Sequence, residues 1–310
     1  MKILFITYTR IGDAVLSSGV LKHLVDRYPD ARFTVACGPL AASLFDAVPR
    51  LDDVIVMTKR PFDGHWFSLW RKVRAEKWDL VVDLRRSLVS YFIRSRKRAV
   101  LGATDNTIHR VPLLSSVLNL SEPAEPFLYT APKNEEVAQR LIPDGPPVLA
   151  LAPMAANLNK TWPADRFAVL GKRLLGTGGP YEGWRVAVFG GQSDADAAAP
   201  VLEELKEYRP MALFGQADLL TVYAALKRCR AFIGNDSGLS HLAAVAGLPT
   251  LAVFGPTDPV CYAPWGEKCR VVRANSDDPQ IGELEPENVE AAFGHLMATV
   301  PEQDQAEHAK

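Results

Sequence analysis

The chain alternates between short apolar runs and longer segments in which apolar residues recur with the helical period. A short continuous apolar run is typical of a buried strand, and the helical recurrence is typical of an amphipathic helix. Strands that alternate with helices predict βα units and a parallel sheet. In the first half the strand-like runs are 2–8, 32–37, 52–57 and 79–84, and the helix-like segments are 14–28, 42–48 and 67–78.

The alternation begins again after the proline-rich segment 141–153, which is the best candidate for a linker, although its end already reads as a strand. The last helix carries Pro286 in its first turn, where a missing N–H costs nothing. In the second half the strand-like runs are 148–153, 185–190, 211–215, 231–234 and 250–255. The helix-like segments are 163–175, 194–208, 218–229, one that starts at residue 236 or 237, and 285–300.

This pattern predicts an α/β protein with two Rossmann-like, doubly wound domains that face a central cleft. The domains are expected at 1–142 and 143–285. A helix at 286–300 is expected to pack back toward the first domain, and 301–310 to form a tail. Ligands of such sheets bind beyond the carboxyl ends of the strands, so the strand-to-helix loops of both halves should carry the site.

Charge is spread unevenly along the 310 residues, although the net charge is only −1, which gives no overall signal for nucleic-acid binding. Residues 51–110 hold 13 Lys and Arg against 7 Asp and Glu, whereas residues 276–310 hold 1 against 9. Such segments are either solvated faces or, for the basic one, a patch that meets an anionic substrate or a membrane surface.

Neither a metal site nor a membrane span is indicated. The four cysteines lack the spacing of metal ligands, so we expect reduced thiols in a cytoplasmic protein. No apolar run reaches the roughly 18–20 residues that a span needs, and residues 1–6 are too short for a signal segment. We therefore expect no metal and no cofactor, and a protein that at most lies peripherally at the inner face of the membrane.

The loop after the first strand, YTRIGDAVLSS (8–18), places Asp13 in the first turn of a helix. An aspartate there is favourable by about 0.3–1 kcal/mol through the helix dipole alone. The functional alternative is a general base at the cleft. Arg10 is either an ordinary loop residue or a contact for an anion. The loop has one glycine where a dinucleotide fingerprint has three, which disfavours a dehydrogenase.

Two loops of the second half offer anion contacts. In LNKTWPADRF (158–167), Lys160 stands just before a helix start and is either a surface residue or a phosphate ligand that acts with backbone N–H groups. In FGPTDP (254–259), the hydroxyl of Thr257 is available to an anion or a sugar.

The stretch GNDSGLSHLAAVAG (234–247) has more polar residues than a helix start needs. Asp236 or Ser237 suits an N-cap, but a cap explains only one of them. Free N–H groups at residues 237–239, together with the small Gly238, would form an anion site suited to a diphosphate. His241 lies one turn further and adds a cation or a donor, although a lone histidine is usually structural.

Taken together, RIGDAVLSSGVLKHL, LNKTWPADRF and GNDSGLSHLAAVAGLPTLAVFGPTDP resemble glycosyltransferase family 9, the ADP-heptose:lipopolysaccharide heptosyltransferases. The weaker match DLVVDLRRSL lies in the first half, so the resemblance runs from residue 1 to about 300. It implies a GT-B fold, with the acceptor on the first domain and the nucleotide sugar on the second. It also implies metal-independent transfer with inversion of the anomeric carbon.

By this resemblance Asp13 matches the catalytic base, and Lys160 matches the lysine beside the donor phosphates. The donor-binding loop corresponds to Asp236, Ser237, Gly238 and His241. The acceptor contacts are the least defined, because residues 59–74 contain no acceptor motif that we recognise. Basic residues of the first half are the candidates for contacts with an anionic acceptor: Arg10, Lys59, Arg60 and Arg85.

The leading hypothesis is an enzyme that moves a heptose, or a related sugar, from ADP-heptose to a lipid-linked saccharide of the lipopolysaccharide core. A transferase with another nucleotide sugar or acceptor, and a GT-B-type sugar-nucleotide epimerase, remain alternatives. A non-catalytic nucleotide-sugar binder is disfavoured because Asp13 and Lys160 are both present.

Overall fold

The structure is a computed structural model that describes residues 1–274 and 281–301. It consists of two compact units, Met1–Ala131 and Pro132–Lys310. Each unit is built on its own parallel sheet, which confirms the predicted α/β class with two doubly wound domains. In the described part of the chain no helix has both the length and the apolar character to cross a membrane.

The first unit has a sheet of order β3-β2-β1-β4-β5 in which all pairs are parallel. The core strand β1 is buried from Ile3 to Ile6, as its continuous apolar run predicts. The strands are β1 (Lys2–Ile6), β2 (Arg32–Cys37), β3 (Leu51–Val56), β4 (Lys77–Asp83) and β5 (Arg94–Val100). The helices are α1 (Ile11–Arg27), α2 (Gly64–Val73) and α3 (Arg110–Ser115).

Shorter 3-10 helices join these elements, and one of them stands where the sequence predicted an ordinary helix at 42–48. They comprise Pro39–Phe45, Pro61–Asp63, Leu88–Tyr91 and Ser116–Leu118.

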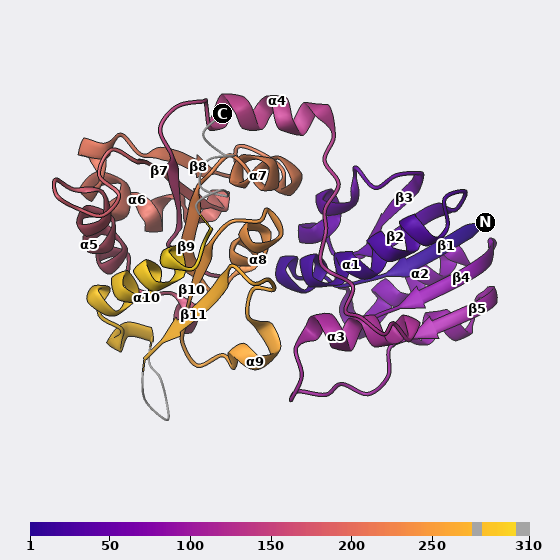
Figure 1. Cartoon of the computed structure of the whole chain (residues 1–310). Helices are drawn as coiled ribbons and strands as arrows, with labels where there is room; N and C mark the ends of the chain where they lie inside the picture. Colours follow the sequence, from indigo (N-terminus) through magenta and orange to yellow (C-terminus); the bar gives the residue numbers. More distant parts are fainter. Residues whose placement is uncertain (275–280, 302–310) are drawn as a thin grey trace. The chain divides into compact units, whose positions relative to one another are not determined.

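The second unit has a sheet of order β11-β10-β9-β6-β7-β8, also parallel throughout. Figure 1 shows α5, α6 and α10 on one face of this sheet and α7 and α8 on the other. The strands are β6 (Val148–Ala152), β7 (Arg185–Gly190), β8 (Met211–Phe214), β9 (Ala231–Asn235), β10 (Thr250–Phe254) and β11 (Cys269–Arg273). The helices are α4 (Pro132–Leu141), α5 (Ala164–Leu175), α6 (Ala195–Glu204), α7 (Leu219–Leu226), α8 (Gly238–Val245), α9 (Pro259–Tyr262) and α10 (Pro286–Ala298).

The boundary between the units differs from the expected one, because α4 belongs to the second unit rather than to the first. Asn134 is buried and its side-chain amide donates to Thr221 Oγ1 at 2.9 Å. On the surface, Lys227 pairs with Glu135 at 3.0 Å. These contacts tie α4 to α7, so the division falls after Ala131, before the proline-rich segment.

The last helix also differs from the expectation that it packs toward the first domain. Val289, Phe293 and Leu296 of α10 are buried in the core of the second unit, together with residues of α5. Arg173 of α5 adds ion pairs with Glu287 and Glu290. The apolar stripe of α10 therefore covers the second sheet. The expected tail lies, from residue 302, outside the described residues.

Candidate functional site

The candidate site of the second unit lies where the strand order reverses, between β6 and β9. These central strands are neighbours, with Ala152 opposite Gly234 at their carboxyl ends. The chain leaves β6 toward α5 and leaves β9 toward α8, which cover opposite faces of the sheet. Such a switch point is where open α/β sheets bind their ligands. The loop after β6 contains Lys160, and the loop after β9 contains Asp236.

Lys160 and Asp236 form an ion pair across this switch point. The ammonium Nζ lies 2.5 Å from Asp236 Oδ2, although the two residues are 76 positions apart in the chain. The Asp236 side chain is only 7% exposed, whereas that of Lys160 is 32% exposed. The carboxylate therefore holds the ammonium group at the rim of the site, where it still reaches solvent.

Asn235 fixes the loop that carries Lys160, a role that the sequence analysis did not identify. Its side chain is fully buried and accepts a hydrogen bond from the backbone N–H of Trp162 at 3.0 Å. Its amide donates to the carbonyl of Pro153 at 2.7 Å. Both ends of the loop after β6 are thus bonded to the residue that precedes Asp236. An asparagine at the end of an apolar strand is the sequence signal for this role.

The polar residues at the start of α8 are not used as helix caps. Ser237 occupies the N-cap position with extended backbone, but its side chain makes no capping bond. Its Oγ is buried and has no hydrogen-bond partner in the described structure. The carboxylate of Asp236 is engaged by Lys160. The hydroxyl of Ser237 and the first N–H groups of α8, beginning at Gly238, are therefore available to an anionic ligand.

His241 and Thr257 lie close to this helix start along the chain. His241 is in α8, one turn after Ser237, and is 5% exposed. Thr257 is partly exposed in the loop between β10 and α9. That loop packs closely against the Lys160 loop, because a side chain added at Gly255 would meet the carbonyl of Asn159 at 2.7 Å.

The candidate site of the first unit lies at the corresponding switch point, between β1 and β4. Asp13 is partly exposed in the first turn of α1, as predicted. Arg10 is exposed at the N-cap position of that helix and makes no capping bond. Tyr8 of the same loop donates its hydroxyl to the carbonyl of Leu84 at 3.1 Å, which joins the loops after β1 and β4.

Arg85 is held between two aromatic rings. Its guanidinium lies 5.7 Å from the centroid of Tyr8 and 5.4 Å from that of Trp66. The loop is shaped by the buried Asp83, which accepts hydrogen bonds from the backbone N–H of Arg85 and from Ser87. Burial raises the pKa of the Asp83 carboxyl above its ordinary value, although these hydrogen bonds oppose the shift. Stacking leaves the donors of Arg85 available to an anion.

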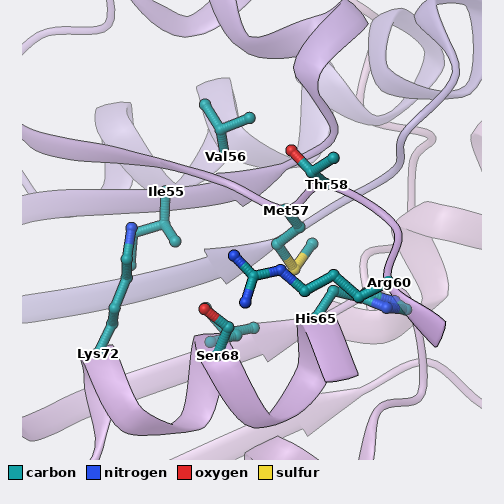
Figure 2. Close-up of a pocket in the computed structure, with 9 residues that line it drawn as sticks. Ile55, Val56, Met57, Thr58, Arg60, His65, Ser68 and Lys72 are labelled. Atoms are coloured by element: carbon teal, nitrogen blue, oxygen red, sulfur yellow. The ribbon is translucent and has the colours of Figure 1, made fainter. Parts of the chain in front are cut away.

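Arg60 lines a pocket of about 50 Å³ between the end of β3 and α2. Figure 2 shows the guanidinium of Arg60 and the hydroxyl of Ser68 directed toward the same space. Thr58 and, from α2, His65 and Lys72 add to its polar lining. His65 Nδ1 is a buried atom without a hydrogen-bond partner in the described structure. Lys59 is exposed and does not line this pocket.

The structure thus brings the predicted residues together to different degrees. Lys160 and Asp236 are in direct contact, and Ser237, Gly238 and His241 share the start of one helix. In the first unit, Arg85 is joined to the Asp13 loop through Tyr8, whereas Lys59 and Arg60 follow a different strand. Among the described residues there is no group of three or more His, Cys, Asp or Glu that could hold a metal ion.

Comparison of the sequence with known proteins points to one family. The sequence model of glycosyltransferase family 9 (heptosyltransferase) matches residues 106–289, more than half of the chain. Lipopolysaccharide heptosyltransferase 2 of Salmonella typhimurium is 26% identical, and the match covers 88% of each chain.

Solved structures extend the likeness to the whole fold. The structure of E. coli ADP-heptose LPS heptosyltransferase II superposes with a TM-score of 0.77 at 23% identity, over 96% of this chain and 99% of the other. A family 9 glycosyltransferase from Veillonella parvula gives a TM-score of 0.80 at 22% identity, over 96% and 98% of the chains. These neighbours confirm the expected GT-B class of fold. The chain belongs to glycosyltransferase family 9 and is a glycosyltransferase.

Proposed function

We propose that this enzyme transfers a heptosyl group from ADP-heptose to a saccharide acceptor of the lipopolysaccharide core. The observation that carries the proposal is the Lys160–Asp236 pair beside the uncapped start of α8. An ammonium group, free backbone N–H groups and an unused hydroxyl are the donors that a sugar diphosphate requires. The names of the relatives, which are lipopolysaccharide heptosyltransferases, support the choice of sugar and acceptor.

In the proposed mechanism Asp13 removes the proton from an acceptor hydroxyl, and the resulting oxygen attacks the anomeric carbon of the donor. The bond between that carbon and the diphosphate oxygen breaks on the opposite face, so that ADP leaves with the bonding electrons. A single displacement of this kind inverts the anomeric centre. The proton remains on Asp13 until it passes to solvent.

The second unit would stabilise the departing diphosphate without a metal ion. Lys160 supplies a positive charge that Asp236 holds in position, and the N–H groups from Gly238 onward supply aligned donors. Ser237 and Thr257 add hydroxyls, and His241 adds a ring nitrogen or a positive charge. Preorganised donors of this type act where charge develops in the transition state.

Basic residues of the first unit would bind the acceptor through its phosphates or acidic sugars. Arg10 and Arg85 lie on the loops nearest to Asp13, and Arg60 lines the polar pocket beside β3. Lys59 would act at longer range, since it is fully on the surface. We also propose that the enzyme works in the cytoplasm, peripherally at the inner face of the membrane, where a lipid-linked acceptor is anchored.

The direct test is transfer from ADP-heptose to a water-soluble, deacylated core saccharide, with product followed by mass spectrometry. The proposal expects a product enlarged by one heptose, with inverted anomeric configuration and undiminished rate in the presence of a chelator. Retention of configuration, or release of free heptose without transfer, would contradict the mechanism. Transfer from a different nucleotide sugar at a higher rate would contradict the choice of donor.

A further inference from the structure

An exposed apolar surface lies on the first unit, over α2 and the 3-10 helix Leu88–Tyr91. We call it the aromatic face, and it consists of Phe67, Leu88, Tyr91 and Phe92. Each of these side chains is at least 61% exposed. Large apolar side chains that gather at one place on a surface mark an interaction site, whereas scattered ones do not.

Contacts between α2 and the segment around residue 92 hold the aromatic face together. The ring of Phe67 lies 5.5 Å from that of Trp70, measured between centroids. The indole N–H of Trp70 donates to the carbonyl of Phe92 at 3.1 Å. The two parts of the face are therefore neighbours in space and are joined by a hydrogen bond between their elements.

The aromatic face is exposed because residues next to it in the sequence are buried. Val89 and Ile93 are buried in the core of the first unit, where they anchor the segment. Their burial turns Leu88, Tyr91 and Phe92 outward. The apolar side chains are thus displayed from an anchored segment, which lowers the conformational cost of binding a partner.

The surroundings of the aromatic face are positively charged. Residues 59–98 contain 12 Lys and Arg against 4 Asp and Glu. Three of these four carboxylates have partners, since Asp83 is buried and accepts backbone hydrogen bonds, and Asp79 and Glu76 accept from the backbone N–H and the ammonium group of Lys2. Exposed cations flank the aromatic side chains on both elements: Arg71, Lys72, Arg74, Arg86 and Arg94.

We propose that the aromatic face docks onto the surface of an anionic lipid bilayer. Exposed aromatic side chains with flanking cations are the combination that binds at the interface of such a membrane. A second copy of this chain fits less well, because pairing two such faces would bring the same positive charges together. This inference rests on the proposed function for its purpose, but its chemistry is independent of any sugar.

Docking at this face would bring the proposed acceptor contacts to the lipid surface. Arg85 lies three residues before Leu88, and it stacks on Tyr8 in the loop that leads to Asp13. Arg85 also lies over the ring of Trp66, the residue before Phe67, so the end of the aromatic face that holds Phe67 and Leu88 is near Arg85. Phe92 lies at the other end of the face, beside the amino end of β5. A saccharide that is linked to a lipid would meet these residues without leaving the membrane.

The test is co-sedimentation of the full chain with vesicles, in the absence of donor and acceptor. One set of vesicles contains equal parts of phosphatidylglycerol and phosphatidylcholine, and the other contains phosphatidylcholine alone. The wild-type protein should sediment with the anionic vesicles, and binding should weaken as salt is added. The triple variant Phe67→Ser, Tyr91→Ser, Phe92→Ser should bind at least about tenfold more weakly.

One further variant tests the contribution of the cations, and another serves as a control for the loss of an exposed apolar side chain. Arg71→Gln with Arg74→Gln should lose the preference for anionic over neutral vesicles. Val169→Ser removes an exposed apolar side chain from α5 in the second unit and should bind like the wild type. Because the substituted side chains are exposed, thermal unfolding should be unchanged in all variants.

The result that would overturn the inference is wild-type protein that sediments with neither kind of vesicle, or a triple variant that binds as the wild type does. A parallel assay on the water-soluble core saccharide keeps the two proposals apart. The triple variant should transfer heptose at the wild-type rate there. A loss of that activity in a folded variant would assign these side chains to the reaction and contradict docking on lipid.

Discussion

The edges of the two sheets hold their polar side chains in different ways. In the second unit, Lys160 is paired with a buried carboxylate, and Asn235 bonds both ends of the Lys160 loop to the strand beside it. In the first unit, Arg85 is held by aromatic stacking, and Arg10 and Lys59 are exposed. The polar side chains of the second unit are thus held in position by bonds within the protein, whereas those of the first unit are mostly exposed charges.

This difference fits the two substrates that we propose. A nucleotide sugar is a small ligand of fixed shape, and preorganised donors bind it with little loss of conformational entropy. A lipid-linked saccharide is larger and partly held by the membrane, so charge and aromatic stacking can guide it without a tightly fitted pocket. Substitutions in the two units should therefore affect different kinetic constants.

The largest effect is expected at Asp13, which we propose as the base that deprotonates the acceptor. Asp13→Asn keeps the size of the side chain but cannot take a proton, so kcat should fall by about a hundredfold or more. Binding of ADP, measured by titration calorimetry, should change by less than about threefold, because no step of donor binding uses this group. Asp26→Asn, an exposed carboxylate of the same helix, is the control and should be fully active. Transfer by Asp13→Asn at the wild-type rate would show that Asp13 is not the catalytic base and only stabilises the start of α1.

The next largest effect is expected at Lys160. Lys160→Met removes the cation and leaves the nearly buried Asp236 without its partner, so a negative charge would face the incoming diphosphate. The Kd for ADP should rise by about tenfold or more. Lys172→Met breaks an ion pair of the same length on the surface and should leave ADP affinity unchanged. Equal affinity in the wild type and Lys160→Met would remove Lys160 from the donor site.

A smaller effect, on ligand binding but not on stability, is expected at Ser237. Since its hydroxyl makes no hydrogen bond in the described structure, Ser237→Ala should leave the free energy of unfolding unchanged. The same change should weaken ADP binding by about threefold to tenfold, the value of one hydrogen bond. Asp218→Ala provides the contrast, because Asp218 caps α7 by accepting from the N–H of Thr221 at 2.8 Å. That variant should lose about 1 kcal/mol of stability. Destabilisation of Ser237→Ala by a similar amount would assign its hydroxyl to the fold.

The smallest effect is expected at Arg85. Arg85→Gln should raise the KM for the acceptor by about threefold to tenfold and leave the Kd for ADP unchanged, since a partly exposed cation contributes modestly to binding. Arg27→Gln, an exposed residue near the end of α1, should alter neither constant. A change in ADP affinity without a change in the acceptor KM would contradict the proposal that Arg85 contacts the acceptor and that the second unit binds the donor.

The strands and helices of the second unit were largely predictable because most of its strands are continuous apolar runs, although the edge strand β11, CRVVR, was missed. Strand β5 was missed in the first unit, since RSRKRAV has neither an apolar run nor a clear alternation. It is an edge strand, where pairing with β4 decides the conformation. Helix α4 was missed for a related reason, because its sequence PKNEEVAQRL is polar and its place depends on the bonds that Asn134 makes.

The candidate site was predictable where residues lie close in sequence. The stretch 234–247 already indicated an anion site at a helix start, and the structure adds that Ser237 is left uncapped. The pairing of Lys160 with Asp236 depends on β6 and β9 being neighbours, which no local pattern reveals. The stacking of Arg85 on Tyr8 and the pocket of Arg60, His65 and Lys72 also arise from segments far apart in the chain.

We propose that the start of α8, with Lys160, binds the diphosphate of the donor. A crystal structure of the protein with ADP would test this most directly. We expect phosphate oxygens within hydrogen-bond distance of the backbone N–H groups at the start of α8, the hydroxyl of Ser237 and the ammonium group of Lys160. A diphosphate bound elsewhere, with these groups unchanged, would contradict it.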